Sequence, residues 1–202
     1  MIHQDINPSN ILFDEFLFPK LSDFCYAYIR ERCLGEDFNI IIPGNPEYLA
    51  PDIFDDNEEA SSCCDGRKSD IYSFAIVMYV IMTGDKPYNN FMKPIGIINY
   101  VKNDHKRPVF NKPIPDCYRD LIEKCWSENP DDRPSGEDIV DILKTNTSFL
   151  TEKVDKEKYF NYIKYIESMK TKPFYDNQLN MPVFPKRDFQ TDLFQKVDIY
   201  DN

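Results

Sequence analysis

A long run of apolar side chains near the middle of the chain is the clearest pattern in the sequence. From Ile71 to Met82 every residue except Ser73 is apolar or aromatic. A helix that is apolar all round belongs in a protein interior, and this run is too short to cross a bilayer, which needs about 20 apolar residues. Asp70 and Gly84 flank the run and are typical of residues that begin and end a helix. We therefore predict a buried central helix; a buried strand is the weaker alternative, because the run is longer than most strands.

Later segments place apolar residues at helical spacing. They are 95–102, 115–126 and 139–143. Ser135 and Asp138 form a near capping box before the last of these. In the stretch 154–170 apolar residues recur every third position between charges, which predicts an amphipathic helix. We expect this helix to pack on the rest of the chain, and binding to a partner is the alternative.

The N-terminal residues predict a short hairpin with polar side chains at its base. Segments 11–13 and 20–22 surround a proline-containing bend, and pairing them would bring Asn10 and Asp23 side by side, close to Asp5. Carboxylate and amide oxygens suit a hard divalent cation, which takes few protein ligands when phosphates supply the rest. A further carboxylate outside the metal shell could orient a nucleophile. Each residue alone would be typical of a turn or a cap, so only the combination indicates a site.

Two stretches are polar and carry no helical pattern. Residues 55–66 are acidic and poor in apolar side chains, which predicts an exposed loop before the central helix. From 171 to 202, scattered prolines and charges predict an extended or disordered tail.

Composition narrows the class of protein. The 202 residues are 42% hydrophobic and 14% aromatic, enough for a real core, and the net charge of -11 argues against nucleic acid or an anionic membrane as a partner. The six cysteines show no paired Cys-x-x-Cys spacing, which favours free thiols over a zinc site. The sequence does not begin like a signal peptide, so we expect a cytoplasmic protein.

Five segments in order resemble motifs of the protein kinases, over about residues 2–144. They are Ile2–Asp14, similar to the catalytic loop H-R-D-L-x-x-x-N; Asp23–Cys25, similar to D-F-G; Gly44–Asp52, similar to G-T-P-E-Y-x-A-P-E; Lys68–Ala75, similar to the start of the buried central helix; and Cys125–Trp126 with Asn129–Pro134, similar to C-W…P-x-x-R-P. The last motif is typical of the tyrosine-kinase-like and tyrosine kinase branches. The resemblance favours the tyrosine-kinase-like group.

The resemblance implies a role for six residues. Asp5 would orient the acceptor hydroxyl, while Asn10 and Asp23 would hold magnesium on ATP. The structural residues are Asp70, which would brace the backbone of the catalytic loop as well as cap its own helix, and Asp52 with Arg133, which would form a buried ion pair. Pro8, which follows Asn7, is closer to the serine/threonine pattern than to the tyrosine pattern.

Four positions depart from the family pattern. Gln4 replaces an arginine, Asn7 replaces a lysine, Cys25 replaces a glycine and Asn45 replaces a threonine. We expect Asn7 and Asn45 to meet across the cleft; independent drift is the alternative. Because Gln4 is uncharged and no Ser or Thr lies between residues 24 and 52, we expect no activation by Ser/Thr phosphorylation.

These observations predict an α+β, mainly α fold: a kinase-like large lobe over 1–145, an appended helix over 146–170 and a tail over 171–202. The 202 residues contain neither the G-x-G-x-x-G loop nor the strand lysine of a small lobe. The resemblance implies a kinase that transfers phosphate from ATP, with Mg²⁺, to Ser or Thr of a protein substrate, the chain alone being inactive. The alternative is a pseudokinase-like scaffold that binds protein partners.

Overall fold

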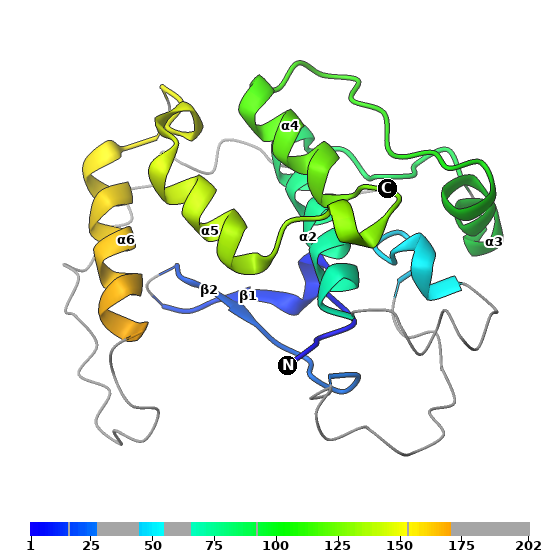
Figure 1. The fold of residues 1–202 in the computed structure, drawn as a ribbon, viewed down its shortest axis with the longest axis horizontal. Coiled ribbons are helices and arrows are strands. Elements are labelled where there is room, and N and C mark those ends of the chain that lie inside the picture. Colours follow the sequence, from blue (N-terminus) through cyan, green and yellow to red (C-terminus); the bar gives the residue numbers. More distant parts are fainter. Residues whose placement is uncertain (16, 28–44, 55–65, 92, 153, 171–202) are drawn as a thin grey trace.

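A computed structural model describes residues 1–15, 17–27, 45–54, 66–91, 93–152 and 154–170 of the chain (Figure 1). Its helices are α2 (Gly66–Thr83), α3 (Pro94–Ile98), α4 (Asp116–Cys125), α5 (Gly136–Thr145) and α6 (Lys156–Lys170), and its strands are β1 (Ile11–Phe13) and β2 (Pro19–Leu21). Short turns of 3-10 or π helix are η1 (Pro8–Asn10), η3 (Pro51–Phe54), η4 (Asn99–Asn103), η5 (Pro130–Asp132) and η6 (Thr147–Phe149). The described part is mainly helical, as the sequence predicts.

Helix α2 stands at the centre of the fold (Figure 1). Tyr72 and Ile76 are fully buried on it, because neighbouring elements cover most of its circumference. The helix ends as predicted: Gly84 has φ of +69° and its N–H donates to the carbonyl of Val80 at 2.8 Å. Its start was predicted wrongly. The helix begins at Gly66, so Asp70 is inside it and does not cap it.

Helix α4 packs against α2 and completes the core. It buries Leu121, Ile122 and Cys125 on one face, in agreement with the amphipathic pattern of 115–126. At the end of α4 the indole of Trp126 lies 6.2 Å from the ring of Tyr79 on α2, between ring centroids. Aromatic contacts of this kind add to the stabilisation from burial.

The other predicted helices differ in length from their patterns. Helix α3 is short and passes into the π turn η4, so the segment 95–102 is not one continuous α-helix. Before α5, Ser135 and Asp138 form the predicted capping box, with both reciprocal hydrogen bonds present. Helix α6 lies beside α5 at the edge of the molecule (Figure 1). The hydroxyl of its Tyr159 donates to the carbonyl of Leu143, so the predicted helix is packed on the rest of the chain.

Strands β1 and β2 form an antiparallel hairpin in which Ile11 pairs with Leu21. The bend was expected near the proline, but Pro19 belongs to β2 and the turn spans 14–18. Proline is compatible with the first position of an edge strand, where its missing N–H costs no ladder bond. In the turn, Leu17 takes φ of +64° and the N–H of Phe18 donates to Asp14 Oδ1 at 2.9 Å.

Several expectations concern residues that the structure does not describe. The loop over 55–66 lies outside the described residues except for Gly66, which is helical. The tail over 171–202 lies outside them as well. Of the cysteines, Cys25, Cys117 and Cys125 are described, and they are free thiols. Within the described ranges, no helix combines the length and the apolar character needed to cross a membrane.

Candidate functional site

The carboxylate of Asp5 is held by two asparagine side chains. The amide of Asn7 donates to Asp5 Oδ1 at 2.9 Å, and the amide of Asn10 donates to Asp5 Oδ2 at 2.8 Å. Asn10 also donates to the backbone carbonyl of Asp5 at 2.9 Å. Each carboxylate oxygen has room for a second hydrogen bond, so Asp5 can still accept one from another hydroxyl.

The hairpin joins this loop to the segment that carries Asp23. The backbone N–H of Ser22 donates to the carbonyl of Asn10 at 2.9 Å, and the Ser22 hydroxyl donates to the same oxygen at 3.1 Å. Asn10 therefore faces Ser22, and Asp23 follows directly. The hairpin thus brings the bases of its two strands together as predicted. The side chains of Asn10 and Asp23 share no hydrogen bond within the described part of the chain.

Asp23 presents an exposed carboxylate on a strained backbone. Its φ of +59° lies in the left-handed region, which few residues other than glycine, asparagine and aspartate occupy. Hydrogen bonds from the Cys25 side chain and backbone lower the pKa of Asp23, and the pKa of the Cys25 thiol is raised by the same carboxylate. Asp23 is therefore a carboxylate at neutral pH.

His3 locks this segment from behind, a role that the sequence analysis did not assign. Its Nε2 lies 3.0 Å from the carbonyl oxygen of Ser22, and its ring centroid lies 4.8 Å from that of Phe24. The side chain is buried. The sequence shows only a histidine two residues before Asp5, and its burial, which calls for a hydrogen-bond partner, is visible in the structure alone.

Asp70 fixes the backbone of the N-terminal loop, as the family resemblance implies. From inside α2 its two carboxylate oxygens accept from the N–H of His3 at 2.7 Å and from the N–H of Gln4 at 2.9 Å. Gln4 has φ of +66° and is held there by this bond. Burial raises the pKa of Asp70, and the two backbone bonds partly oppose that effect.

The predicted ion pair between Asp52 and Arg133 is present. Arg133 Nη2 lies 2.6 Å from Asp52 Oδ1, and the arginine side chain is 0% exposed. The remaining donors of Arg133 reach the carbonyls of Ser127 at 2.9 Å and Lys68 at 3.0 Å. The Ser69 hydroxyl donates to the other oxygen of Asp52 at 2.8 Å. Both charges are thus paired and hydrogen-bonded, which a buried ion pair requires.

Ser73 ties α2 to the segment before the ion pair. Its hydroxyl donates to the carbonyl of Tyr48 at 2.7 Å inside the protein. Ser73 is the single polar residue in the apolar run from 71 to 82, and this isolated polar position is the sequence signal for such a bond. The bond gives a buried backbone carbonyl a hydrogen-bond partner.

The predicted contact between Asn7 and Asn45 is absent. The side-chain oxygen of Asn7 accepts from the N–H of Ser9 at 2.9 Å while its amide donates to Asp5. The side-chain oxygen of Asn45 accepts from the N–H of Glu47 at 3.1 Å. Each asparagine caps its own turn, which is the commonest use of this residue in loops.

The donor set fits a magnesium ion that is shared with phosphates. The Asn10 side-chain oxygen accepts no hydrogen bond in the described contacts, and Asp23 has an exposed carboxylate. No cluster of three His, Cys, Asp or Glu side chains suited to a metal occurs within the described ranges. Magnesium needs only one or two protein ligands when phosphates and water complete its coordination shell. Asn10 and Asp23 would supply that number of oxygen ligands.

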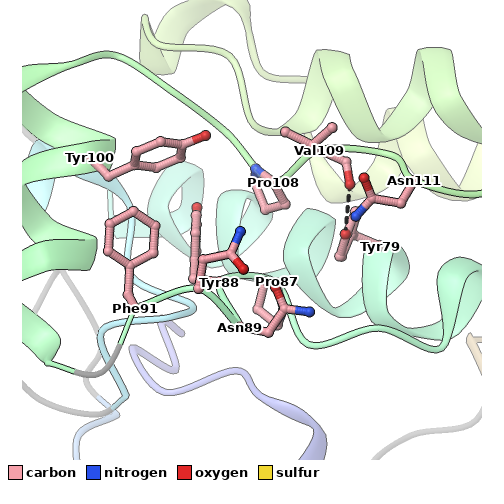
Figure 2. Close-up of a pocket in the computed structure, with 10 residues that line it drawn as sticks. Tyr79, Pro87, Tyr88, Asn89, Phe91, Tyr100, Pro108, Val109 and Asn111 are labelled. Carbon is pink, nitrogen blue, oxygen red and sulfur yellow. Dashed lines mark hydrogen bonds between the residues drawn. The ribbon is translucent and has the colours of Figure 1, made fainter.

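A small pocket lies apart from this loop (Figure 2). Tyr88, Phe91 and Tyr100 form its aromatic wall, and Pro108 and Asn111 line the opposite side. Its volume of about 50 Å³ suits a few water molecules and is far below the size of typical ligand sites. None of its lining residues belongs to the N-terminal loop or the hairpin, so it is not the candidate site.

Comparison with known proteins identifies the family. The model of the protein tyrosine and serine/threonine kinase family matches residues 1–143. The chain is 31% identical to the dual specificity protein kinase shkD of Dictyostelium discoideum over 141 residues, 69% of this chain and 18% of that protein. It is 32% identical to the dual specificity protein kinase shkC of the same organism over 142 residues, 70% of this chain and 27% of that protein.

A viral protein is similar over the same length. The chain is 34% identical to a putative serine/threonine-protein kinase/receptor of Acanthamoeba polyphaga mimivirus over 142 residues, which are 69% of this chain and 8% of that protein. The chain thus spans less than a third of the length of these curated relatives. The chain belongs to the protein tyrosine and serine/threonine kinase family.

Proposed function

We propose that residues 1–145 are the large lobe of a protein kinase. Together with a small lobe, this large lobe would transfer phosphate from ATP to Ser or Thr of a protein substrate. The observation that carries this proposal is the arrangement of Asp5, Asn10 and Asp23. Asn10 donates to Asp5 and pairs through its backbone with Ser22, the neighbour of Asp23. One acid beside a pair of metal-binding oxygens is the arrangement that phosphoryl transfer uses.

Asp5 would accept a hydrogen bond from the acceptor hydroxyl and hold its oxygen towards the phosphorus that it attacks. The bond from that phosphorus to the leaving oxygen of ADP then breaks, and the hydroxyl proton passes to Asp5 or to water. Asn7 and Asn10 would keep the Asp5 carboxylate in one orientation. Magnesium, held by Asn10 and Asp23, would supply positive charge beside the phosphates.

Exposed apolar side chains on the hairpin support the need for a second lobe. Leu12 is 55% exposed and Phe13 is 66% exposed on β1, and Leu21 is 45% exposed on β2. Large apolar side chains gathered on one element are typical of a surface that another domain covers. In a complete kinase this surface would face the small lobe, which binds the adenine and the phosphates from the other side. The chain alone would therefore bind ATP weakly and transfer no phosphate.

A pseudokinase-like scaffold is the second candidate, and the environment of Asn7 favours it. The family places a lysine there to contact the transferred phosphate, whereas Asn7 carries no charge and spends its amide on Asp5. Cys25 likewise replaces a glycine beside the metal-binding Asp23. Both changes weaken catalysis without disturbing the fold. Such a protein would bind protein partners and remain silent as an enzyme.

Joining residues 1–202 to a small lobe separates the two candidates. The small lobe of a relative such as the Dictyostelium kinase shkC supplies the missing half. We expect transfer of radiolabelled phosphate from ATP to a protein substrate, and loss of that transfer in Asp5→Asn and Asp23→Ala variants, since each removes a carboxylate proposed to lie at the reacting atoms. An equally stable Asp141→Ala variant is the control. A folded chimera that transfers no phosphate would contradict the kinase proposal and favour the scaffold.

A further inference from the structure

The turn of the hairpin is clamped by two tyrosines of the C-terminal helix. The ring of Phe18 stacks on Tyr162 with centroids 5.4 Å apart and on Tyr165 with centroids 5.1 Å apart, at interplanar angles of 17° and 16°. In Figure 1 the loop between β1 and β2 reaches towards α6. Helix α6 lies beyond residues 1–143, the part that the kinase family model matches, so this clamp is an addition to the family fold.

Helix α6 is also anchored to α5. The Tyr159 hydroxyl donates to the carbonyl of Leu143, and Lys144 Nζ lies 3.1 Å from Glu167 Oε1. The lysine side chain is mostly buried and the glutamate is about half exposed. The helix therefore spans from the body of the protein to the tip of the hairpin. Its bonds to α5 hold Tyr162 and Tyr165 in place against Phe18.

An unbroken set of hydrogen bonds runs from Phe18 to the candidate site. In the turn, the N–H of Phe18 donates to Asp14 Oδ1 at 2.9 Å and its carbonyl accepts from the N–H of Asp14 at 3.1 Å. The paired strands follow, and at their base Ser22 donates to Asn10 at 2.9 Å. A movement of the turn would change the pairing at the end where Asn10 and Asp23 leave the strands.

We propose that α6 is a positioning element for the candidate site and that Phe18 is its positioning residue, a proposal that rests on the function proposed above. A hairpin of two three-residue strands is marginal by itself in water, because it buries little apolar surface. The exposed side chains Leu12 and Phe13 confirm that most of this hairpin is uncovered within the described chain. The Phe18 clamp supplies the missing support at one end.

Hydrogen exchange measured by NMR on the complete chain tests the proposal without any assay of catalysis. The reporter is the N–H of Ser22, which bonds to Asn10, and the reference is the N–H of Ile76 in the buried middle of α2. In Phe18→Leu, which keeps an apolar side chain but removes both ring stacks, Ser22 exchange should accelerate about tenfold, while Ile76 exchange stays unchanged. Phe18→Tyr keeps the stacking and should restore the slow exchange.

Phe160→Leu is the matched control. Phe160 is on the same helix, is 45% exposed and contacts the ring of Tyr159 within that helix. Its substitution should leave Ser22 exchange unchanged. If Phe18→Leu leaves Ser22 unchanged, or accelerates Ser22 and Ile76 equally, α6 is a general stabiliser and the proposal is wrong. If Phe18→Leu does not fold, Tyr165→Leu repeats the test from the other side of the clamp, with the same criteria.

Failure of this test leaves the proposed kinase function standing, because exchange reports the hairpin and not phosphate transfer. Conversely, a silent chimera would leave the clamp in place. In the chimera, Phe18→Leu should lower the rate of phosphate transfer at saturating ATP more than it raises the KM for ATP, since Asp5 and Asn10 orient the reacting groups. Equal loss in Phe160→Leu would again contradict the positioning role.

Discussion

The ion pair between Asp52 and Arg133 and the hairpin of β1 and β2 are built in opposite ways. Arg133 and Asp52 are both buried and paired with each other, and the arginine side chain is 0% exposed. On the hairpin, Phe13 is 66% exposed and Asp23 carries an open carboxylate. The first region finds all of its partners within the described chain. The second finds only some of them, at Asp70 and at the Phe18 clamp.

This difference separates folding from chemistry. Polar groups of the scaffold are buried, so they find their hydrogen-bond partners within the same chain. Residues that transfer phosphate must leave room for ATP, metal and substrate, so they lie at an open surface and retain unused hydrogen-bonding capacity.

Removal of Arg133 should have the largest effect. Arg133→Ala removes the cation that pairs with the buried carboxylate of Asp52, and breaking a buried ion pair typically costs about 3–5 kcal/mol. We expect little soluble, folded protein, and any that remains should unfold at much lower denaturant concentration. Lys158→Ala, which breaks the exposed pair with Asp155, should cost less than about 1 kcal/mol. Similar denaturation midpoints for the two variants would contradict the ion-pair account.

Asp70→Ala should be the next most damaging change. It leaves the N–H groups of His3 and Gln4 without their acceptor. Because His3 is buried, its unpaired N–H should cost about 1–3 kcal/mol. We expect a loss of about 2 kcal/mol in the free energy of unfolding, measured in urea. Asp141→Ala on the exposed side of α5 serves as the control and should change stability little.

The same residue predicts a pH dependence. The folded-state pKa of Asp70 is raised above 3.8, so the folded chain binds this proton more tightly than the unfolded chain. Its contribution to stability is fully present below pH 3.8 and is lost as pH rises through the folded pKa. The stability advantage of the natural chain over Asp70→Asn should therefore grow when the pH is lowered from about 7 to about 4. An advantage that shrinks on acidification would show that hydrogen bonding outweighs burial at Asp70.

The smallest effect is expected at Gln4. Its φ of +66° is costly for any residue with a Cβ, by about 1 kcal/mol, and glycine avoids that cost. Gln4→Gly should therefore be more stable than Gln4→Ala by about 0.5–1 kcal/mol, although glycine loses more chain entropy on folding. Thermal unfolding of the two variants gives the order directly. A more stable alanine variant would mean that the loop relaxes out of this conformation.

The scaffold was largely predictable from the sequence. Three patterns each predict a single structure. They are the apolar run from 71 to 82, the capping box at Ser135 and the paired motifs of Asp52 and Arg133. The start of α2 was missed because Asp70 is a good capping residue and its carboxylate serves the backbone of a distant loop instead. No local pattern distinguishes these two uses of an aspartate.

The candidate site was predictable in its residues but less so in its contacts. The motif spacing indicated Asp5, Asn10 and Asp23 correctly as neighbours of one hairpin. It did not reveal that Asn7 turns back to Asp5, because an asparagine can satisfy itself within its own turn. The Phe18 clamp was also hidden, since stacking between residues so far apart in the chain leaves no periodic signal.

The most direct test of the account is whether residues 1–202 alone use ATP. The purified chain should show no magnesium-dependent stabilisation by ATP in a thermal shift assay and no transfer of radiolabel to a general protein substrate, because it supplies only one wall of the phosphate site. Transfer of label that disappears in Asp23→Ala would contradict the account and would make this chain an enzyme without a second lobe.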